Sequence, residues 1–181
     1  MYFEEKGKAN TAATAREVIR VAKQRKINYI VVASNTGETA EFFKGTDFNI
    51  VIVTSAYGFA KKGESQMSDE KRKELEGSGM KIVTCSHVLS GAERSLSRKF
   101  GGVYPVEIIA NTLRMFGQGV KVGVEISTMA LDSGAIPYGE EIIAVGGTTR
   151  GADTAIIIKP EHANDILSTK ICEIICKPHL G

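Results

Sequence analysis

Three short runs of apolar, largely β-branched residues, at 29–33, 48–53 and 81–84, most constrain what this chain can fold into. Runs of this length without polar alternation are typical of strands that are buried on both faces, as in parallel sheets. The segment 10–26, before the first run, places apolar residues at helical spacing, and 68–76, before the third run, is typical of a charged helix that ends at Gly77-Ser78-Gly79. Strand and helix therefore alternate, which predicts an α/β fold with a mostly parallel sheet.

The second half of the chain continues this alternation. Residues 120–131 fit both the alternation of a strand and one face of a helix. Ser133-Gly134 followed by Pro137 favours a helix, because glycine tolerates the left-handed backbone of a helix end. We therefore expect a single domain over residues 1–181. Further strands are predicted at 141–145, 154–158 and 171–176, and further helices at 36–44, 89–101 and 105–117.

Charge and composition exclude several partner classes. The 23 Lys and Arg residues against 21 Asp and Glu give a net charge of +2, and the basic residues are dispersed, so we expect no nucleic-acid partner. No apolar run approaches the roughly 20 residues that span a bilayer, and the opening residues hold no apolar signal core, so we expect no membrane partner. Three cysteines without CxxC spacing favour a reducing, cytoplasmic location. Cys172 and Cys176 lack further ligands at metal-site spacing, so we predict no metal.

The turn after the first predicted strand is the leading candidate for a binding site. Its sequence, Ser34-Asn35-Thr36-Gly37-Glu38-Thr39-Ala40, follows a buried strand and leads into the helix expected at 36–44. The free N–H groups and the dipole at the start of such a helix favour an anion. The alternative is that a hydroxyl group in this turn only caps the helix. The predicted phosphate contacts are Ser34, Asn35, Thr36, Gly37 and Thr39.

A glycine-rich loop between the strands expected at 141–145 and 154–158 is the second candidate. It is longer than the two-residue turn that a simple hairpin needs. Long loops of this composition are often functional, although a mobile hairpin tip is the alternative. Arg150 would pair with a phosphate oxygen, and Asp153 would accept hydrogen bonds from ligand hydroxyl or ring N–H groups. The predicted contacts are Gly146, Gly147, Thr148, Thr149, Arg150, Gly151, Asp153 and Thr154.

The loops after the second and third predicted strands add further candidates, because open parallel sheets present ligand contacts at these ends. Tyr57, next to Gly58, would stack on a ring. Cys85-Ser86-His87 place a nucleophile-type residue near a base-type residue. Neighbours in an extended chain point to opposite faces, so this adjacency does not make a catalytic pair. We predict ligand contacts from Tyr57, Gly58 and His87, and no catalytic residue.

The turn at 34–40 and the run Gly134-Ala135-Ile136-Pro137-Tyr138-Gly139-Glu140-Glu141-Ile142-Ile143-Ala144-Val145-Gly146-Gly147 resemble the C-terminal domain of pyruvate kinase. More closely, nearly the whole chain resembles a small prokaryotic family of free-standing proteins with that α/β domain. The resemblance implies a three-layer α/β/α fold with strand order 3-2-1-4-5 and an antiparallel fifth strand. This order places the turn after strand one beside the loop after strand four, at a topological switch point.

The resemblance also implies a ligand. In pyruvate kinase this domain is regulatory and its turn holds a phosphate of a sugar bisphosphate, while the catalytic barrel lies elsewhere, so we expect no kinase activity. The free-standing family resembles a binder of a phosphorylated, nucleotide-like small molecule, for which we expect flavin mononucleotide (FMN). The sequence leaves open a flavin-dependent oxidoreductase, a phosphoester-processing enzyme and a regulatory effector-binding module. The apolar last strand and the two helices expected at 89–117 would also allow a homo-oligomer.

Overall fold

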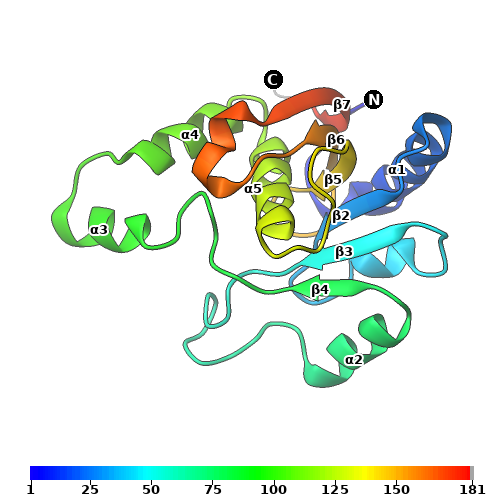
Figure 1. The fold of residues 1–181 in the computed structure, drawn as a ribbon, viewed down its shortest axis with the longest axis horizontal. Coiled ribbons are helices and arrows are strands. Elements are labelled where there is room, and N and C mark those ends of the chain that lie inside the picture. The colour runs from blue at the N-terminus through cyan, green and yellow to red at the C-terminus, as the bar shows by residue number, and fades with distance from the viewer. Residues whose placement is uncertain (180–181) are drawn as a thin grey trace.

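A seven-stranded sheet forms the centre of the molecule in a computed structural model, which describes residues 1–179 (Figure 1). The strands are β1 (Tyr2–Phe3), β2 (Tyr29–Ala33), β3 (Asn49–Val53), β4 (Lys81–Val83), β5 (Ile142–Gly146), β6 (Thr154–Lys159) and β7 (Lys170–Pro178). Their order across the sheet is β1-β7-β6-β5-β2-β3-β4. The predicted order 3-2-1-4-5 corresponds to β4-β3-β2-β5-β6 and is confirmed, including the antiparallel pairing of β5 with β6.

Two strands extend the sheet beyond these five. The predicted last strand is confirmed as β7, which pairs antiparallel with β6. The short β1 pairs in parallel with β7, and the N-terminal ammonium of Met1 donates a hydrogen bond to the Ile175 carbonyl (2.7 Å). β1 was not expected, because two residues carry no periodicity that a sequence pattern could show.

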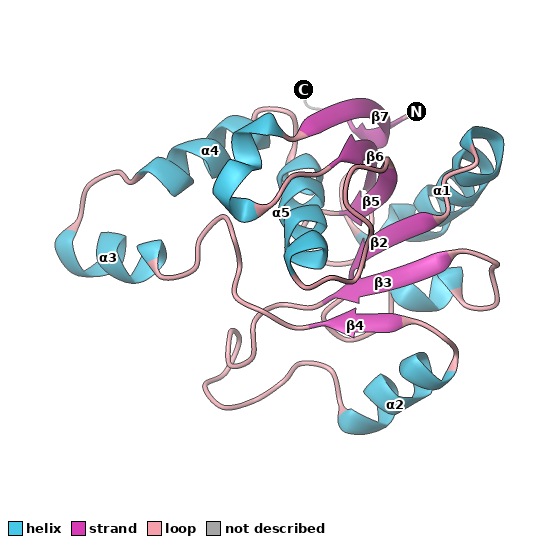
Figure 2. Cartoon of the chain, in the orientation of Figure 1, coloured by secondary structure: helices cyan, strands magenta, loops and turns pink. Residues whose placement is uncertain are grey.

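Helices connect the strands and flank the sheet (Figure 2). The α-helices are α1 (Thr11–Arg25), α2 (Asp69–Gly77), α3 (Glu93–Phe100), α4 (Pro105–Arg114) and α5 (Gln118–Asp132). Short 3-10 helices are η1 (Lys8–Asn10), η2 (Ala40–Phe43) and η3 (Ala163–Ser168). The helix predicted over 120–131 is confirmed as α5, which resolves the ambiguity of that segment. The two helices predicted within 89–117 are confirmed with narrower bounds.

The prediction of a helix over 36–44 is wrong. Only the four-residue η2 forms there, and it begins at Ala40. Gly37 has a φ of 90°, a left-handed conformation that an α-helix does not accept. A Cβ atom at this position would lie 2.9 Å from Leu75 Cδ1, so the turn packs tightly against α2 through its glycine. The early turn, which we define as residues 34–39, is therefore a loop and not a helix start.

Two apolar clusters cover the two faces of the sheet. On one face Val18 of α1, Phe43 of η2 and Leu75 of α2 pack over the sheet and are almost fully buried. On the other face α5 contributes Val124 and Met129. The predicted three-layer α/β/α architecture is confirmed. Within residues 1–179, no helix combines the length and the apolar character that crossing a membrane requires.

Small residues let α5 approach the sheet closely. A Cβ atom added to Gly119 would overlap the side chain of Thr154 in β6. A Cβ atom added to Gly123 would lie 2.9 Å from Ile156 Cδ1. The distance between α5 and the sheet therefore depends on glycine at the first of these positions in particular, because the short, branched Thr154 side chain cannot move far.

We expect Gly119→Ala to lower the free energy of unfolding by about 1–3 kcal/mol, the usual cost of overpacking a buried site. Urea denaturation measures this change. Gly77→Ala is the matched control, since a Cβ atom there meets no atom within 4 Å and its effect should stay within about 1 kcal/mol. Equal effects of the two substitutions would contradict the close approach of α5.

Candidate ligand-binding site

The candidate site lies at the carboxyl edge of the parallel strands. β2 pairs with β3 on one side and with β5 on the other, so the chain leaves β2 in one direction and returns later on the opposite side. This is the topological switch point at which open α/β sheets bind ligands. The early turn follows β2 directly. The late loop, which we define as residues 147–153, follows β5.

The early turn presents a series of free backbone donors. The N–H group of Ser34 still donates to the Val53 carbonyl (3.1 Å). In the described part of the chain, the N–H groups of residues 35–39 donate no hydrogen bond. Asn35 Oδ1 accepts a hydrogen bond from the Ser55 N–H (2.7 Å), which fixes the turn to the segment after β3. Successive free N–H groups in a tight turn make a concave site for an anion.

Positive charges flank the early turn. Lys8 Nζ lies 2.7 Å from Glu38 Oε2, in an exposed ion pair. The hydrogen bond from Lys8 holds the pKa of Glu38 below its usual value, and the charge of Arg150 lowers this pKa further. Arg150 belongs to the late loop, so the early turn and the late loop lie near each other, as the pairing of β2 with β5 requires.

Asp153 folds the late loop against the N-terminal segment. This carboxylate is fully buried. Its Oδ2 accepts hydrogen bonds from the N–H groups of Gly7 (2.8 Å) and Thr148 (3.1 Å), and its Oδ1 accepts one from the Thr154 hydroxyl (2.7 Å). Thr154 is buried as well, against α5. Asp153 and Thr154 were predicted to contact a ligand, and the structure shows both side chains hydrogen-bonded inside the protein.

The glycines of the late loop are explained by packing. A Cβ atom at Gly146 or Gly147 would overlap backbone carbonyl oxygens, and one at Gly151, which has a φ of 71°, would overlap Thr11 and Lys8. Close approach to a ligand is therefore not needed to account for these positions. The tip of the loop remains exposed at Thr149 and Arg150.

The exposed tip of the late loop has an uncommon backbone. Thr149 has a φ of 62°, a left-handed value that is rare for a β-branched residue. The Arg150 N–H donates to the Thr148 carbonyl (2.8 Å), and the Thr149 hydroxyl donates to the same oxygen (2.6 Å). Such strain often occurs where a loop presents groups to a ligand.

The middle loop, residues 54–66, closes another side of this edge. The Ala56 N–H donates to His87 Nε2 (3.3 Å), and the Phe59 ring centroid lies 4.7 Å from that of His87. The Tyr57 hydroxyl donates to the Gly63 carbonyl (2.5 Å), while most of the Tyr57 side chain is exposed. Gly58 has a φ of 77°, as the sharp turn of this loop requires. His87 therefore anchors a loop that presents two aromatic rings.

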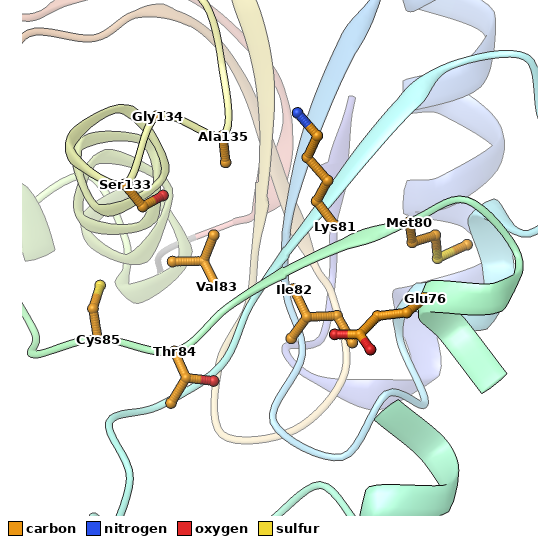
Figure 3. Close-up of a pocket in the computed structure, with 10 residues that line it drawn as sticks. All are labelled: Glu76, Met80, Lys81, Ile82, Val83, Thr84, Cys85, Ser133, Gly134 and Ala135. Carbon is orange, nitrogen blue, oxygen red and sulfur yellow. The ribbon is translucent and has the colours of Figure 1, made fainter. Parts of the chain in front are cut away.

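Among residues 1–179, no hydrogen bond joins the Cys85 thiol to His87, whose Nε2 accepts the Ala56 N–H. Burial raises the pKa of the Cys85 thiol, and the charge of Asp132 raises it further, so the thiol stays protonated at neutral pH. The thiol lies in a groove of about 600 Å³ beside the edge strand β4, opposite Ser133 and Ala135 at the end of α5 (Figure 3). No residue predicted from sequence to bind the ligand lines this groove.

A second cavity, of about 630 Å³, adjoins the late loop. Thr148 is the one predicted contact residue that lines it. The other lining groups include Lys6, Arg114, Gln118 and His179. They were not predicted from the sequence because they come from the N-terminal segment, the end of α4, the start of α5 and the residue after β7, which the fold brings together.

Lys8 and Gly7 were also not predicted as site residues, although the order of the predicted elements indicates their position. A helix that precedes a parallel strand begins at the carboxyl edge of the sheet. The residues just before α1 are therefore expected beside the early turn. That inference needs only the predicted order of helix and strand, together with the lysine at position 8.

The fold and this edge define an α/β domain whose sheet has a topological switch point between β2 and β5. The family model of the pyruvate kinase alpha/beta domain matches residues 12–158, from α1 to β6, and the chain belongs to this family. The resemblance stated from the sequence is thereby confirmed.

Solved pyruvate kinases from Cryptosporidium parvum are among the similar structures. One matches with a TM-score of 0.44 and 16% identity over 82% of this chain. Another, in complex with ADP, matches with a TM-score of 0.41 and 17% identity over 81% of this chain. Each match covers 22% of the kinase chain, so this chain spans about a fifth of the length of these kinases.

The His87 anchor predicts a pH response of the middle loop. Burial lowers the pKa of His87 from its ordinary 6.5, so the closed loop favours the neutral ring whose Nε2 accepts the Ala56 N–H. When the loop opens, the pKa of His87 returns to its ordinary 6.5. Closure of the loop is therefore strongest above that pH and weakens as the pH falls below it. We expect amide protection factors in the middle loop to fall between about pH 8 and about pH 5.

Hydrogen exchange measured by mass spectrometry, corrected for intrinsic rates, gives these protection factors. His87→Asn removes the titrating group and should abolish the pH response. His162→Asn is the control, because that histidine is exposed and lies outside the middle loop. The same pH response in wild type and His87→Asn would overturn the assignment.

Proposed function

We propose that this chain binds FMN at the carboxyl edge between β2 and β5 and acts as a binding protein rather than as a kinase. The observation that carries the proposal is the series of unpaired N–H groups at residues 35–39, flanked by Lys8 and Arg150. A phosphate group suits this arrangement, since it accepts several hydrogen bonds and carries negative charge.

The phosphate would sit on the early turn. The N–H groups of residues 35–39 and the exposed Thr36 hydroxyl supply donors. Ser34 and Thr39 are buried, so their contribution is to shape the turn and present its backbone. Arg150 adds a charged donor from the late loop, and a phosphate would compete with Glu38 for Lys8.

The aromatic part of the ligand would lie against the middle loop. Tyr57 and Phe59 are exposed there, and His87 holds the loop in place. A flat heteroaromatic ring gains stacking contacts on such side chains. The remaining contacts of the proposal are Gly58, Gly146, Gly147, Thr148, Thr149 and Gly151.

A binding role is supported over an enzymatic one by the state of the candidate catalytic groups. The Cys85 thiol is held protonated, as its raised pKa indicates. His87 Nε2 accepts the Ala56 N–H, and Asp153 is fully buried with both oxygens bonded. The three side chains considered for acid, base or nucleophile roles are therefore engaged within the protein or inactive at neutral pH.

Ligand release and binding measurements test the proposal. Denaturing protein purified from its native source and analysing the released compounds by mass spectrometry should yield FMN. Calorimetry should show that FMN binds and that riboflavin, which lacks the phosphate, binds at least about tenfold more weakly, a difference of about 1.4 kcal/mol. Thr36→Asp places a carboxylate against the phosphate and should weaken FMN binding to a similar degree.

Thr112→Asp is the matched control, because Thr112 is an exposed threonine on α4 and its substitution should leave the dissociation constant unchanged. Absence of FMN binding by calorimetry would refute the proposal. Equal affinities for FMN and riboflavin would show that the early turn does not hold the phosphate.

A further inference from the structure

The helices α3 and α4 lead away from the sheet and form an arm, which we define as residues 93–114 (Figures 1 and 2). α3 has no buried residue, and α4 buries only Ala110. The Glu93 carboxylate accepts hydrogen bonds from the N–H groups of Val106 and Glu107 (both 3.2 Å), which joins the start of α3 to the start of α4. α3 therefore has little packing against the domain, whereas α4 contacts α5 and packs Leu113 against the core.

Apolar side chains at the end of the arm are left uncovered. Phe100 is 69% exposed and Val103 is 76% exposed, and Leu96 and Ile108 are exposed beside them in the sequence. An isolated helix of eight residues has marginal stability in water, and most helical stability in proteins comes from packing an apolar face. A surface that covers these side chains would stabilise α3.

The charge of the arm indicates what kind of surface would cover it. α3 carries Arg94, Arg98 and Lys99, and its one acidic residue, Glu93, is used to cap α4. The end of the arm is therefore both apolar and basic. A second arm would bring like charges together, so an arm-to-arm contact is disfavoured.

A surface that is acidic and apolar, and so complements the end of the arm, lies elsewhere on the same chain. Tyr138, Leu167 and Ile171 are exposed there. We define the acidic patch by these three residues together with Asp132, Glu140, Glu141, Glu161 and Asp165. Two lysines, Lys159 and Lys170, offset part of its charge.

The members of the acidic patch are connected in space. Asp132 Oδ1 lies 2.7 Å from His162 Nδ1, and the His162 ring stacks on Tyr138 with centroids 5.6 Å apart. The nearby charges of Glu161 and Asp165 help to raise the pKa of the Tyr138 hydroxyl. Negative charge therefore surrounds an exposed aromatic ring, which complements the basic and apolar end of the arm.

We propose that this chain self-associates by seating the arm of one copy on the acidic patch of a second copy. Apolar residues of the arm lie against Tyr138 and Leu167, and Arg98 and Lys99 face the carboxylates. Two such contacts related by a two-fold axis close a dimer in which each copy gives an arm and receives one. The interface does not involve the early turn, where the phosphate is proposed to bind.

Sedimentation velocity with charge-reversal variants tests the proposal. The wild-type chain should be dimeric at about 0.05 M salt and dissociate progressively toward about 0.5 M, since exposed charge pairs are screened. The arm variant Arg98→Glu with Lys99→Glu should be monomeric at the same concentration. The patch variant Glu140→Lys with Asp165→Lys should be monomeric too. Arg16→Glu with Lys23→Glu, on the exposed side of α1, is the control and should remain dimeric.

An equimolar mixture of the arm variant and the patch variant tests whether the arm contacts the acidic patch. In the mixed dimer an acidic arm meets a basic patch, and a basic arm meets an acidic patch, so association should return. Phe100→Ser, which leaves the charge unchanged, should also weaken association at least tenfold. A wild-type monomer at every salt concentration, an arm or patch variant that associates like wild type, or a mixture that stays monomeric would each overturn the proposal.

Discussion

The proposed site depends on the buried carboxylate of Asp153. A buried charge is costly unless donors satisfy it, and here the N–H groups of Gly7 and Thr148 and the hydroxyl of Thr154 do so. Because these donors come from the N-terminal segment, the late loop and β6, the carboxylate ties three parts of the chain together. This junction holds Lys8 and Arg150 near Glu38 of the early turn.

Tight glycine packing supports the same geometry. Gly119 lets α5 lie directly over Thr154, and Gly151 lets the late loop lie against Lys8 and Thr11. Gly37 allows the early turn to pack against α2 while its backbone donors stay free. These three glycines thus serve close packing around the switch point. The arm and the acidic patch form a separate system, in which exposed apolar surface and charge are divided between two regions of the chain.

Much of the fold could be predicted from the sequence, because buried strands such as 29–33 have a strong local pattern. The order of five strands came from the resemblance to a known domain and not from periodicity. The prediction of a helix at 36–44 was wrong, since the positive φ of Gly37 and its packing against Leu75 depend on tertiary contacts. The role of Asp153 was missed for the same reason: its donors lie up to 146 positions away in the sequence.

Backbone amide shifts during an FMN titration test the central claim most directly. In ¹⁵N-resolved NMR spectra of the assigned protein, the account predicts the largest downfield shifts at the N–H groups of residues 35–39, with smaller changes at Arg150. Riboflavin should leave the signals of residues 35–39 in place. Saturable shifts confined to other parts of the chain, with residues 35–39 unmoved by FMN, would contradict the claim that the early turn holds the phosphate.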